Sequence, residues 1–256
     1  MNLSFAGCGF LGVYHLGVAK CLVDHAPNFL RSIKAFAGAS AGSLAAAMLA
    51  TSAPIDKCSD YVVELTNDAR KNPLGPFSPQ FDLVGNLRKG MEEYLPSNCH
   101  KLASGRLFIS VTSLKTRKNF MISEYESKDE LMKVLLASCY IPFYVGLDFP
   151  EFKGEKWADG GLTNNLPVLP FGETILISPF SGKDMHISPE DESQGVTDIT
   201  FHNMNIFVNR ENLQRELRIF IPPKKEGIEE IVQKGYEDAL KFLHKKNLCD
   251  HSLLVV

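Results

Sequence analysis

A serine lies between two glycines early in the chain, in the run Gly38-Ala39-Ser40-Ala41-Gly42. The pattern is Gly-x-Ser-x-Gly. It follows the apolar run IKAFA, which is typical of a strand, and precedes SLAAAMLA, which is typical of a helix. A serine on a sharp strand-to-helix turn projects as a nucleophile, and the start of the helix favours negative charge beside it. The run therefore predicts a nucleophile at Ser40. The competing interpretation is a tight turn whose serine caps the helix.

A second glycine pattern, FAGCGFLG, places Gly7, Gly9 and Gly12 between a strand pattern and a helix pattern. This spacing is also that of a dinucleotide-binding turn, which needs an acidic residue about 20 positions later to hold a ribose. Residues 25–55 contain no Asp or Glu, so a nucleotide site is not expected. Both glycine turns follow strand ends and should meet at one edge of a parallel sheet. We therefore expect the N–H groups of Gly7, Cys8 and Gly9 to form an oxyanion hole facing the serine.

A serine nucleophile needs a base, and none of the seven histidines lies in a glycine-rich or otherwise marked setting. The run KWADGGLTNNLP instead carries Asp159, Gly160 and Gly161. This aspartate is the candidate base. The competing interpretation of an Asp-Gly pair is a hairpin turn.

The periodicity of the chain predicts the elements that must position these residues. Strands separated by helices favour a parallel sheet and an α/β fold. One domain over 1–248 is expected, with 249–256 a flexible tail. The last helix should dock on the core and not on a lipid surface, because its polar side has no basic rim. The expected strands are 2–6, 33–37, 106–113, 119–125 and 173–178; the expected helices are 13–26, 43–50, 55–71, 127–138 and 228–243; the expected loops are 71–83 and 182–195.

The composition narrows the class of protein. The 256 residues carry a net charge of −3 without a basic stripe, so nucleic acid is not an expected partner. The six cysteines form no Cys-x-x-Cys pair and suggest free thiols in a reducing compartment. No histidine or carboxylate cluster has metal-ligand spacing, so neither a metal nor a cofactor is expected. No apolar run approaches the roughly 18 residues of a membrane span, and no basic segment suggests a signal peptide.

Taken together, GCGFLG, GASAG and DGG in this order resemble the patatin-like phospholipase family. The runs SFAGCGFLGVYHLG, KLASGRLFIS, SKDEL, IPFYVGL, DGGLTNNLP and SPFSG resemble its adipose triglyceride lipase branch, including the short members, over roughly residues 2–248. The resemblance implies a three-layer α/β/α sandwich with a mostly parallel central sheet. It also implies a catalytic dyad in which Ser40 is the nucleophile and Asp159 its only base.

The same resemblance implies hydrolysis of neutral lipid esters such as triacylglycerols and retinyl esters, transfer of acyl groups between glycerides, and some phospholipase activity. It implies a cytoplasmic protein peripheral to lipid droplets or membranes, with a protein coactivator as a partner. Many family members carry Lys or Arg before the last glycine of the oxyanion loop, where this chain has Leu11. An apolar residue there suits a neutral lipid. The long C-terminal extension of larger branch members has no counterpart in this sequence, so strong droplet targeting is not expected.

Three alternatives stay open at this point. A triad in the order Ser40, Asp159, then His186 or His202 is compatible with the sequence order. A calcium-independent phospholipase would use the same dyad on a different substrate. A lipid-droplet-binding protein that sequesters a lipase partner would keep the scaffold with little or no catalysis.

Overall fold

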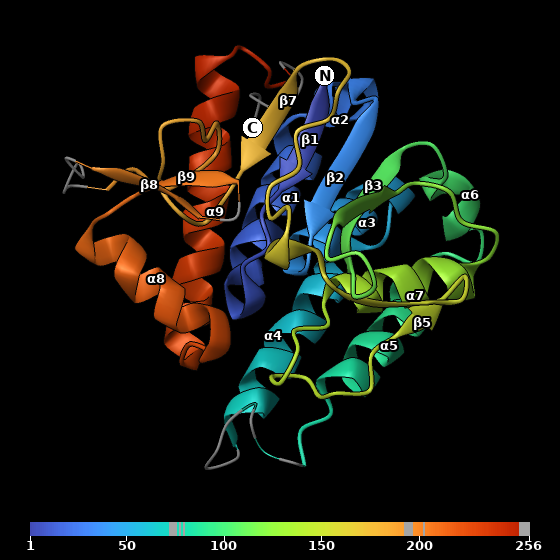
Figure 1. Cartoon of the computed structure of the whole chain (residues 1–256). Coiled ribbons are helices and arrows are strands. Elements are labelled where there is room, and N and C mark those ends of the chain that lie inside the picture. Colours follow the sequence, from blue (N-terminus) through green and yellow to red (C-terminus); the bar gives the residue numbers. More distant parts are fainter. Residues whose placement is uncertain (72–75, 77, 79, 192–196, 202, 251–256) are drawn as a thin grey trace.

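One mixed β-sheet forms the centre of the molecule (Figure 1). The computed structural model describes residues 1–71, 76, 78, 80–191, 197–201 and 203–250. The sheet order is β5-β6-β3-β2-β1-β7, with β4 paired to β3; β1, β2, β3 and β7 are parallel, and β4 and β6 run antiparallel to β3. The strands are β1 (Asn2–Phe5), β2 (Ala35–Ala39), β3 (Leu107–Ser113), β4 (Asn119–Ile122), β5 (Glu151–Phe152), β6 (Glu155–Asp159) and β7 (Thr174–Ile177), and β8 (Asp198–Phe201) pairs with β9 (Met204–Phe207) in a separate hairpin.

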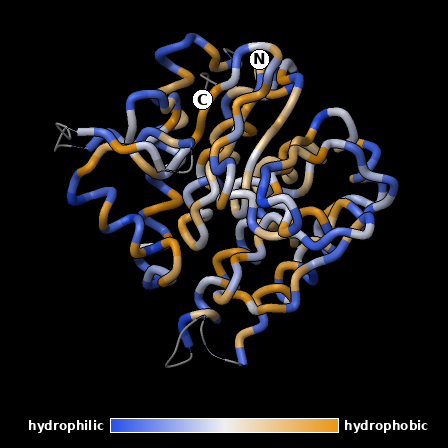
Figure 2. Tube along the Cα trace, in the orientation of Figure 1, coloured by the Kyte–Doolittle hydropathy of each residue, from blue (hydrophilic) through white to orange (hydrophobic). Residues whose placement is uncertain are grey.

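Helices flank the sheet on both sides, so the predicted α/β fold with a mostly parallel central sheet between helices is confirmed. Every residue of β1 and β2 is buried, as is typical of parallel strands covered on both faces. Figure 2 shows a contrast in hydropathy between the central strands, which lie toward the hydrophobic end of the scale, and the outer helices, in which hydrophobic and hydrophilic residues are mixed. The helices are α1 (Val13–His25), α2 (Pro27–Ser32), α3 (Ala41–Thr51), α4 (Ile55–Lys71), α5 (Leu83–Tyr94), α6 (Cys99–Ala103), α7 (Lys128–Ser138), α8 (Arg210–Phe220) and α9 (Lys225–Lys245), with short 3-10 turns at Gly9–Gly12 and Gly160–Leu162.

The last helix, α9, docks on the core against α1, as predicted (Figure 1). Gly17 and Gly235 let the two backbones approach closely: a Cβ on Gly17 would overlap with the carbonyl of Val232. Tyr14 on α1 donates a hydrogen bond to Asp238 on α9 at 2.9 Å. Beyond α9, the N–H of Asp250 donates to the carbonyl of α1's last residue at 2.8 Å. Positions 251–256 of the predicted tail lie outside the described residues.

Among the described residues, eight elements had no counterpart in the sequence predictions: α2, α5, α6, α8, β5, β6, β8 and β9. Three of them, α5, α8 and β6, are the most relevant to the site. The two helices begin at side-chain caps, where Asp82 accepts from the Gly85 N–H and Asn209 accepts from the Asn212 N–H. Helix α5 starts in the predicted loop 71–83, of which 72–75, 77 and 79 lie outside the described residues. The strand β6 matters most for the site, because it ends at Asp159.

Candidate active site

The backbone at Ser40 has the sharp turn that the Gly-x-Ser-x-Gly pattern predicts. Ser40 adopts φ 50° and ψ −130° between the last residue of β2 and the first of α3. Its N–H donates to Ser138 Oγ at 2.9 Å, and that hydroxyl donates to the Ser110 carbonyl at 2.7 Å. The Ser40 side chain makes no capping hydrogen bond to α3. The interpretation as a helix-capping serine is therefore wrong, and the hydroxyl is left available for chemistry.

The flanking glycines of this turn allow close backbone packing. A Cβ on Gly42 would overlap with the carbonyl of Phe5 at the end of β1, and a Cβ on Gly38 would lie 2.5 Å from the backbone of Gly42. The turn therefore packs tightly against the end of β1 and the start of α3, and this packing fixes the direction in which Ser40 projects.

Strand register brings Asp159 to the end of β2. Ala39 pairs with Ser110 of β3, and Asp159 pairs with the next residue of β3, Val111. Because β4 occupies the other edge of β3 at Val111, β2 and β6 meet end to end along one edge of that strand. The chain therefore places residue 159 beside residue 40 although 119 positions separate them. Asp159 ends a strand of the central sheet and leads into a 3-10 turn, so its interpretation as part of a hairpin turn is wrong.

The Asp159 carboxyl is buried, with 3% of the residue exposed. Its Oδ1 accepts a hydrogen bond from the Gly161 N–H at 2.7 Å, whereas its Oδ2 has no hydrogen-bond partner among the described residues. Burial raises the pKa of Asp159 to about 7, and the nearby Ser40 hydroxyl and the Gly161 N–H partly offset that rise. A buried carboxylate oxygen with no partner, facing a serine, is suited to accept the proton of that serine.

The glycine loop lies directly beside the two residues. A Cβ on Gly7 would lie 3.2 Å from Ser40 Cβ, and one on Gly12 would lie 2.9 Å from Ala41 Cβ. Gly9 has a positive φ of 53°, and a Cβ there would overlap with the carbonyl of Ile219 in α8. Near Asp159, a Cβ on Gly160 would overlap with Ser110, and one on Gly161 would lie 2.6 Å from Asn165 Oδ1. Every predicted motif glycine is thus a point of close approach in or around the site.

The N–H groups of the glycine loop differ in their partners. The Gly7 N–H donates to the Asn165 carbonyl at 3.1 Å. Within the described residues, the N–H groups of Cys8, Gly9 and Ala41 have no hydrogen-bond acceptor. Cys8 itself is buried, with its Sγ 3.3 Å from Nε2 of the buried His15, and burial lowers the pKa of His15 to about 4. This histidine is therefore neutral and sits behind the loop as a structural support.

Asn165 is a site residue to which the sequence analysis assigned no role. Its Nδ2 donates to the Gly7 carbonyl at 2.9 Å, and its N–H donates to Asn203 Oδ1 at 2.7 Å. It therefore ties the glycine loop to the segment that follows Asp159. The only signal in the sequence is its place in TNNLP, directly after Asp159-Gly160-Gly161.

Two cavities meet at Ser40. The apolar cavity, of about 130 Å³, runs between α3, α4 and α5. Among the described side chains that line it, only Ser40, Thr66, Tyr144, Cys139 and Met48 carry an oxygen or sulfur atom. It continues into a further space of about 70 Å³ toward Tyr61 and Tyr94, with Leu44, Val62 and Leu87 lining both. The aspartate cavity, of about 150 Å³, is lined by Ser40, Asp159, Asn165, Leu162, Glu216 and residues of the glycine loop and α8. No lysine, arginine or histidine among the described residues lines either cavity.

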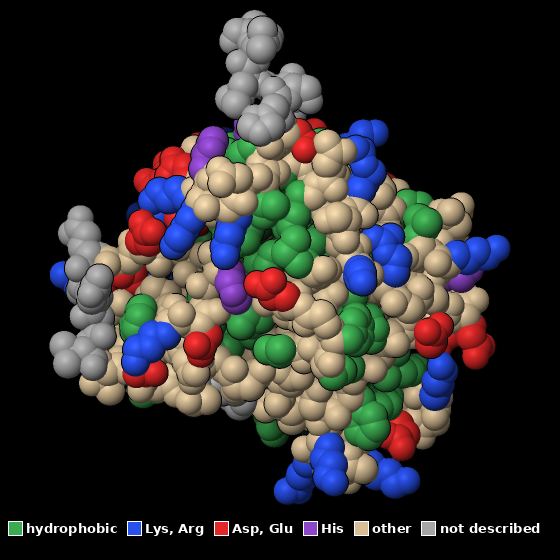
Figure 3. Space-filling model, turned by 90° about the horizontal axis from the view of Figure 1, so that it is seen from above, with side chains coloured by type: hydrophobic (Ala, Val, Ile, Leu, Met, Phe, Trp, Pro, Cys, Tyr) green, Lys and Arg blue, Asp and Glu red, His purple; other side chains and the backbone are tan. Residues whose placement is uncertain are grey.

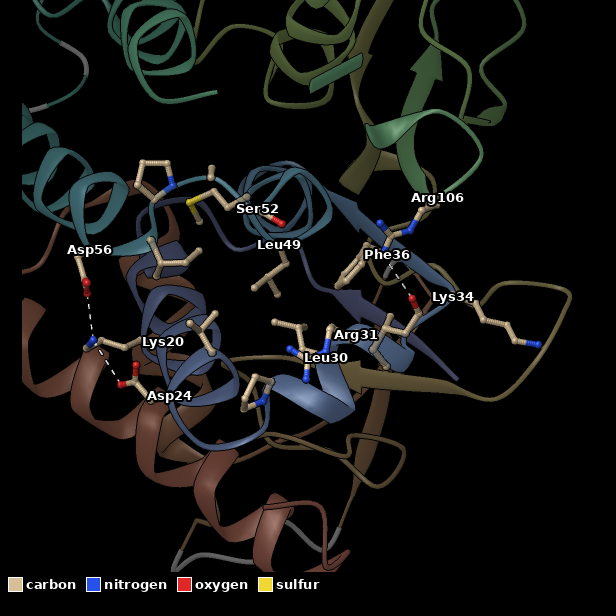
Figure 4. A pocket seen from close by; sticks show the side chains of 17 residues that line it. Lys20, Asp24, Leu30, Arg31, Lys34, Phe36, Leu49, Ser52, Asp56 and Arg106 are labelled. Carbon is tan, nitrogen blue, oxygen red and sulfur yellow. Dashed lines mark hydrogen bonds and ion pairs between the residues drawn. The ribbon is translucent and has the colours of Figure 1, made fainter. Parts of the chain in front are cut away.

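A larger cavity of about 660 Å³ lies at the other end of α3 and does not contain the candidate residues (Figure 4). There Lys20 bridges Asp24 and Asp56 at 3.3 and 3.0 Å, and the Arg106 guanidinium lies over the Phe36 ring. Figure 3 looks onto the end of the molecule where the central strands begin, and hydrophobic side chains form small groups there among charged ones. This cavity is larger than the two at Ser40 but brings no nucleophile and base together.

Of the two histidines proposed for a triad, His186 is not drawn into the site. His186 Nδ1 accepts the Leu176 N–H at 3.0 Å, and His186 lines neither cavity. His202 lies outside the described residues. In the part of the chain that the structure describes, no group of three or more His, Cys, Asp or Glu could hold a metal ion. No helix among the described residues is long and apolar enough to span a membrane.

Comparison with known proteins gives a consistent family match. The family described as patatin-like phospholipase matches residues 3–171. Human patatin-like phospholipase domain-containing protein 4 is 45% identical over 248 residues, which cover 96% of this chain and 98% of that protein. Rat patatin-like phospholipase domain-containing protein 2 is 42% identical over 96% of this chain and 52% of its own length. Human 1-acylglycerol-3-phosphate O-acyltransferase PNPLA3 is 39% identical over 97% of this chain and 52% of its own length. The chain thus spans nearly all of the first relative and about half of the other two.

Among solved structures, VipD from Legionella pneumophila superposes with a TM-score of 0.55 at 13% sequence identity. The match covers 95% of this chain and 66% of the VipD chain, and it shows a likeness of fold.

Proposed function

This chain belongs to the patatin-like phospholipase family, and we propose that it is a serine acylhydrolase that cleaves carboxylic esters of lipids with Ser40 and Asp159. The observation that carries the proposal is the buried Asp159 carboxyl, whose Oδ2 has no hydrogen-bond partner among the described residues and which shares the aspartate cavity with Ser40. A structural aspartate at this depth would have its oxygens fully hydrogen-bonded. An unpartnered oxygen beside a serine is the arrangement that a proton acceptor needs.

In the first half of the reaction, Ser40 Oγ attacks the ester carbonyl while Asp159 Oδ2 takes the hydroxyl proton. An ordinary carboxylate is a weak base, but burial raises the pKa of Asp159 to about 7. A base with a pKa near the working pH is the most effective, because it is both deprotonated and able to hold the proton. The Gly161 N–H fixes Oδ1 and so orients Oδ2 toward the serine.

The negative charge that forms on the ester oxygen needs hydrogen-bond donors. We assign this role to the N–H groups of Cys8, Gly9 and Ala41, which have no acceptor among the described residues. The Gly7 N–H already donates to the Asn165 carbonyl, so Gly7 is not assigned as a donor. Its lack of a side chain leaves room next to Ser40. Each such donor typically lowers the barrier by about 3 kcal/mol.

The first half ends when the bond to the alcohol breaks: protonated Asp159 gives its proton to the leaving alcohol, and the acyl group remains on Ser40. In the second half, water gives a proton to Asp159 and attacks the acyl group, and Asp159 passes that proton to Ser40 Oγ as the fatty acid leaves. A second alcohol in place of water would give acyl transfer. Acyl transfer is a second candidate function because a human relative at 39% identity is named 1-acylglycerol-3-phosphate O-acyltransferase.

The cavities favour neutral lipid esters, such as triacylglycerols and retinyl esters, as substrates. The apolar cavity ends at Ser40 and suits a fatty acyl chain. In the part of the chain that the structure describes, the only charged residues that line either cavity are Asp159 and Glu216, both acids. A phosphate group would meet these carboxylates without a lysine or arginine to offset its charge. Leu11, which lies buried behind the glycine loop, likewise brings no cation.

Fatty acid release from emulsified triolein, retinyl palmitate and phosphatidylcholine, measured side by side without calcium, tests this function. We expect release from the two neutral esters, lost in Ser40→Ala and Asp159→Asn and retained when His186 and His202 are both replaced by alanine. Release from phosphatidylcholine alone would keep the dyad and favour a calcium-independent phospholipase. Loss of activity in the histidine variant would favour the triad. No release by a folded protein, with or without a diacylglycerol acceptor, would favour a lipid-binding protein or an enzyme that needs a coactivator.

A further inference from the structure

Helix α8 turns Ile219 inward but carries its other apolar residues on the side that faces solvent. Leu213 and Leu217 are each 62% exposed, and Phe220 is 40% exposed. Their spacing of four and three residues places them on one stripe of the helix. Figure 1 shows α8 at the edge of the molecule, with no other element covering its outer side. A surface helix of a globular protein normally has the reverse arrangement.

Polar contacts hold α8 in this orientation. Asn212 is buried and donates to the carbonyls of Ser181 and Phe207 at 3.0 and 2.9 Å. Arg215 forms an ion pair with the buried Asp191 at 2.6 Å. Because these groups would lose their partners if the helix rolled, the outward position of the leucines is built into the fold.

A second exposed apolar segment lies beside the end of α8. Phe143 is 86% exposed and Leu147 is 64% exposed in the loop after α7. The Tyr144 ring lies 5.4 Å from the Phe220 ring, and the Tyr144 hydroxyl donates to the Phe220 carbonyl at 3.1 Å. The loop and the helix therefore form one continuous surface. We call it the mouth patch and define it by Phe143, Leu147, Leu213, Leu217, Phe220 and Ile221.

The mouth patch is continuous with the candidate active site. Tyr144 lines the apolar cavity and Phe220 lines the aspartate cavity, and the two cavities meet at Ser40. A lipid ester that leaves an apolar phase through this surface would reach the nucleophile without crossing water.

Cations accompany the apolar stripe along α8. Arg210 and Arg218 are exposed, and neither takes part in an ion pair among the described residues. On a helical projection both arginines lie to one side of the stripe formed by Leu213 and Leu217, away from the buried side of the helix. This is the arrangement of a helix that lies in a membrane interface. Exposed arginines beside exposed leucines are complementary to phosphate headgroups above acyl chains.

We propose that the mouth patch docks the protein on a phospholipid-covered lipid surface, with its apolar side chains among the acyl chains and Arg210 and Arg218 at the phosphates. The proposal rests on the proposed function, since it identifies where the lipid substrate enters. It differs from that function in being measurable without catalysis.

The test is co-sedimentation of the Ser40→Ala protein with vesicles of phosphatidylcholine, with and without a quarter of phosphatidylserine. Adding Phe143→Glu and Leu217→Glu should lower the partition coefficient at least tenfold on both vesicles, because two inserted side chains become charged. Adding Arg210→Gln and Arg218→Gln should lower it about fivefold per arginine on the anionic vesicles only. Val168→Glu is the matched control, since Val168 is 64% exposed and lines neither cavity.

The same glutamate pair in the Ser40 protein should keep its rate on a short, water-soluble ester and lose it on emulsified triolein. Unchanged vesicle binding by the glutamate variant, or an equal loss in Val168→Glu, would overturn the proposal. So would a dimer in sedimentation velocity that Leu217→Glu dissociates without changing vesicle binding, because the patch would then join two copies. Patch-dependent binding by a protein that cleaves no ester would support the docking surface and reject only the proposed function.

Discussion

Replacing Asp159 with asparagine should abolish activity and at the same time stabilise the folded protein. Burial raises the pKa of this carboxyl from 3.8 to about 7. Between these two values the folded protein keeps a proton that the unfolded chain releases. Stability therefore falls as the pH rises from about 4 to about 7, and it stays lowered above that range. Asparagine has nearly the same shape but no charge, so it escapes this cost.

The magnitude follows from the size of the shift. A change of about 3 pH units corresponds to about 4 kcal/mol at pH 8 and to almost nothing at pH 3.5. The asparagine carbonyl can still accept the Gly161 N–H, and its amide can donate to the Ser40 hydroxyl, so no new unpaired group offsets the gain. For a chain of this length, about 4 kcal/mol corresponds to a rise in Tm of roughly 10 °C.

Urea unfolding of wild type and Asp159→Asn at several pH values from 4 to 8 measures this effect. The difference in the free energy of unfolding should grow with pH and level off above pH 7. Asp60→Asn, which changes an exposed carboxylate of α4, is the control and should show no such growth. A gain that is absent, or that is the same at every pH, would refute the reasoning that Asp159 is buried at an energetic cost.

Three further predictions concern the same site. The value of kcat/KM for a soluble ester should rise about tenfold per pH unit below pH 7 and level off above it, since only the carboxylate form of Asp159 accepts the proton; a flat profile would contradict this base. Gly9→Ala should reduce the rate at least tenfold in the same assay, because the new Cβ would overlap with α8. Gly154→Ala is the control: its φ is 72° and the space around it is open, so its free energy of unfolding in urea should fall by only about 1 kcal/mol and its activity should not change. Ser138→Ala should lower both kcat and the free energy of unfolding, the latter by about 1–3 kcal/mol, since the Ser40 N–H loses its acceptor. Unchanged values would show that the turn at Ser40 does not depend on this hydrogen bond.

The sequence predicted well the elements whose signal is local. The strand and helix on either side of Ser40 follow from the apolar runs around it, and the structure places them at Ala35–Ala39 and Ala41–Thr51. The expected helix 127–138 is present as α7 (Lys128–Ser138), and Ser127 caps it by accepting the Glu130 N–H at 3.1 Å. These features depend on residues within one or two turns of each other, so a single sequence contains them.

The features that were missed depend on contacts between distant segments. Helix α8 has a polar sequence with scattered leucines, because its buried side is formed by Asn212 and Arg215 with Ile219 as its one apolar residue. The meeting of β2 and β6 on β3 depends on strand register, which no local pattern specifies. The role of Asn165 in fixing the glycine loop likewise appears only when residues 7 and 165 lie side by side. The two ends of the dyad were predictable as motifs, whereas the geometry that joins them required the structure.

The measurement that tests the dyad most directly is the mass of the protein and of its peptides after brief reaction with a p-nitrophenyl ester whose acyl group is hydrolysed slowly from the enzyme. The account predicts one acyl group on Ser40 in the wild type and none in Ser40→Ala or Asp159→Asn at pH 7. Cys139, which also lines the apolar cavity, should stay unmodified because burial raises the pKa of its thiol. An acyl group on Cys139 or another residue, or undiminished acylation of Ser40 in Asp159→Asn, would contradict it.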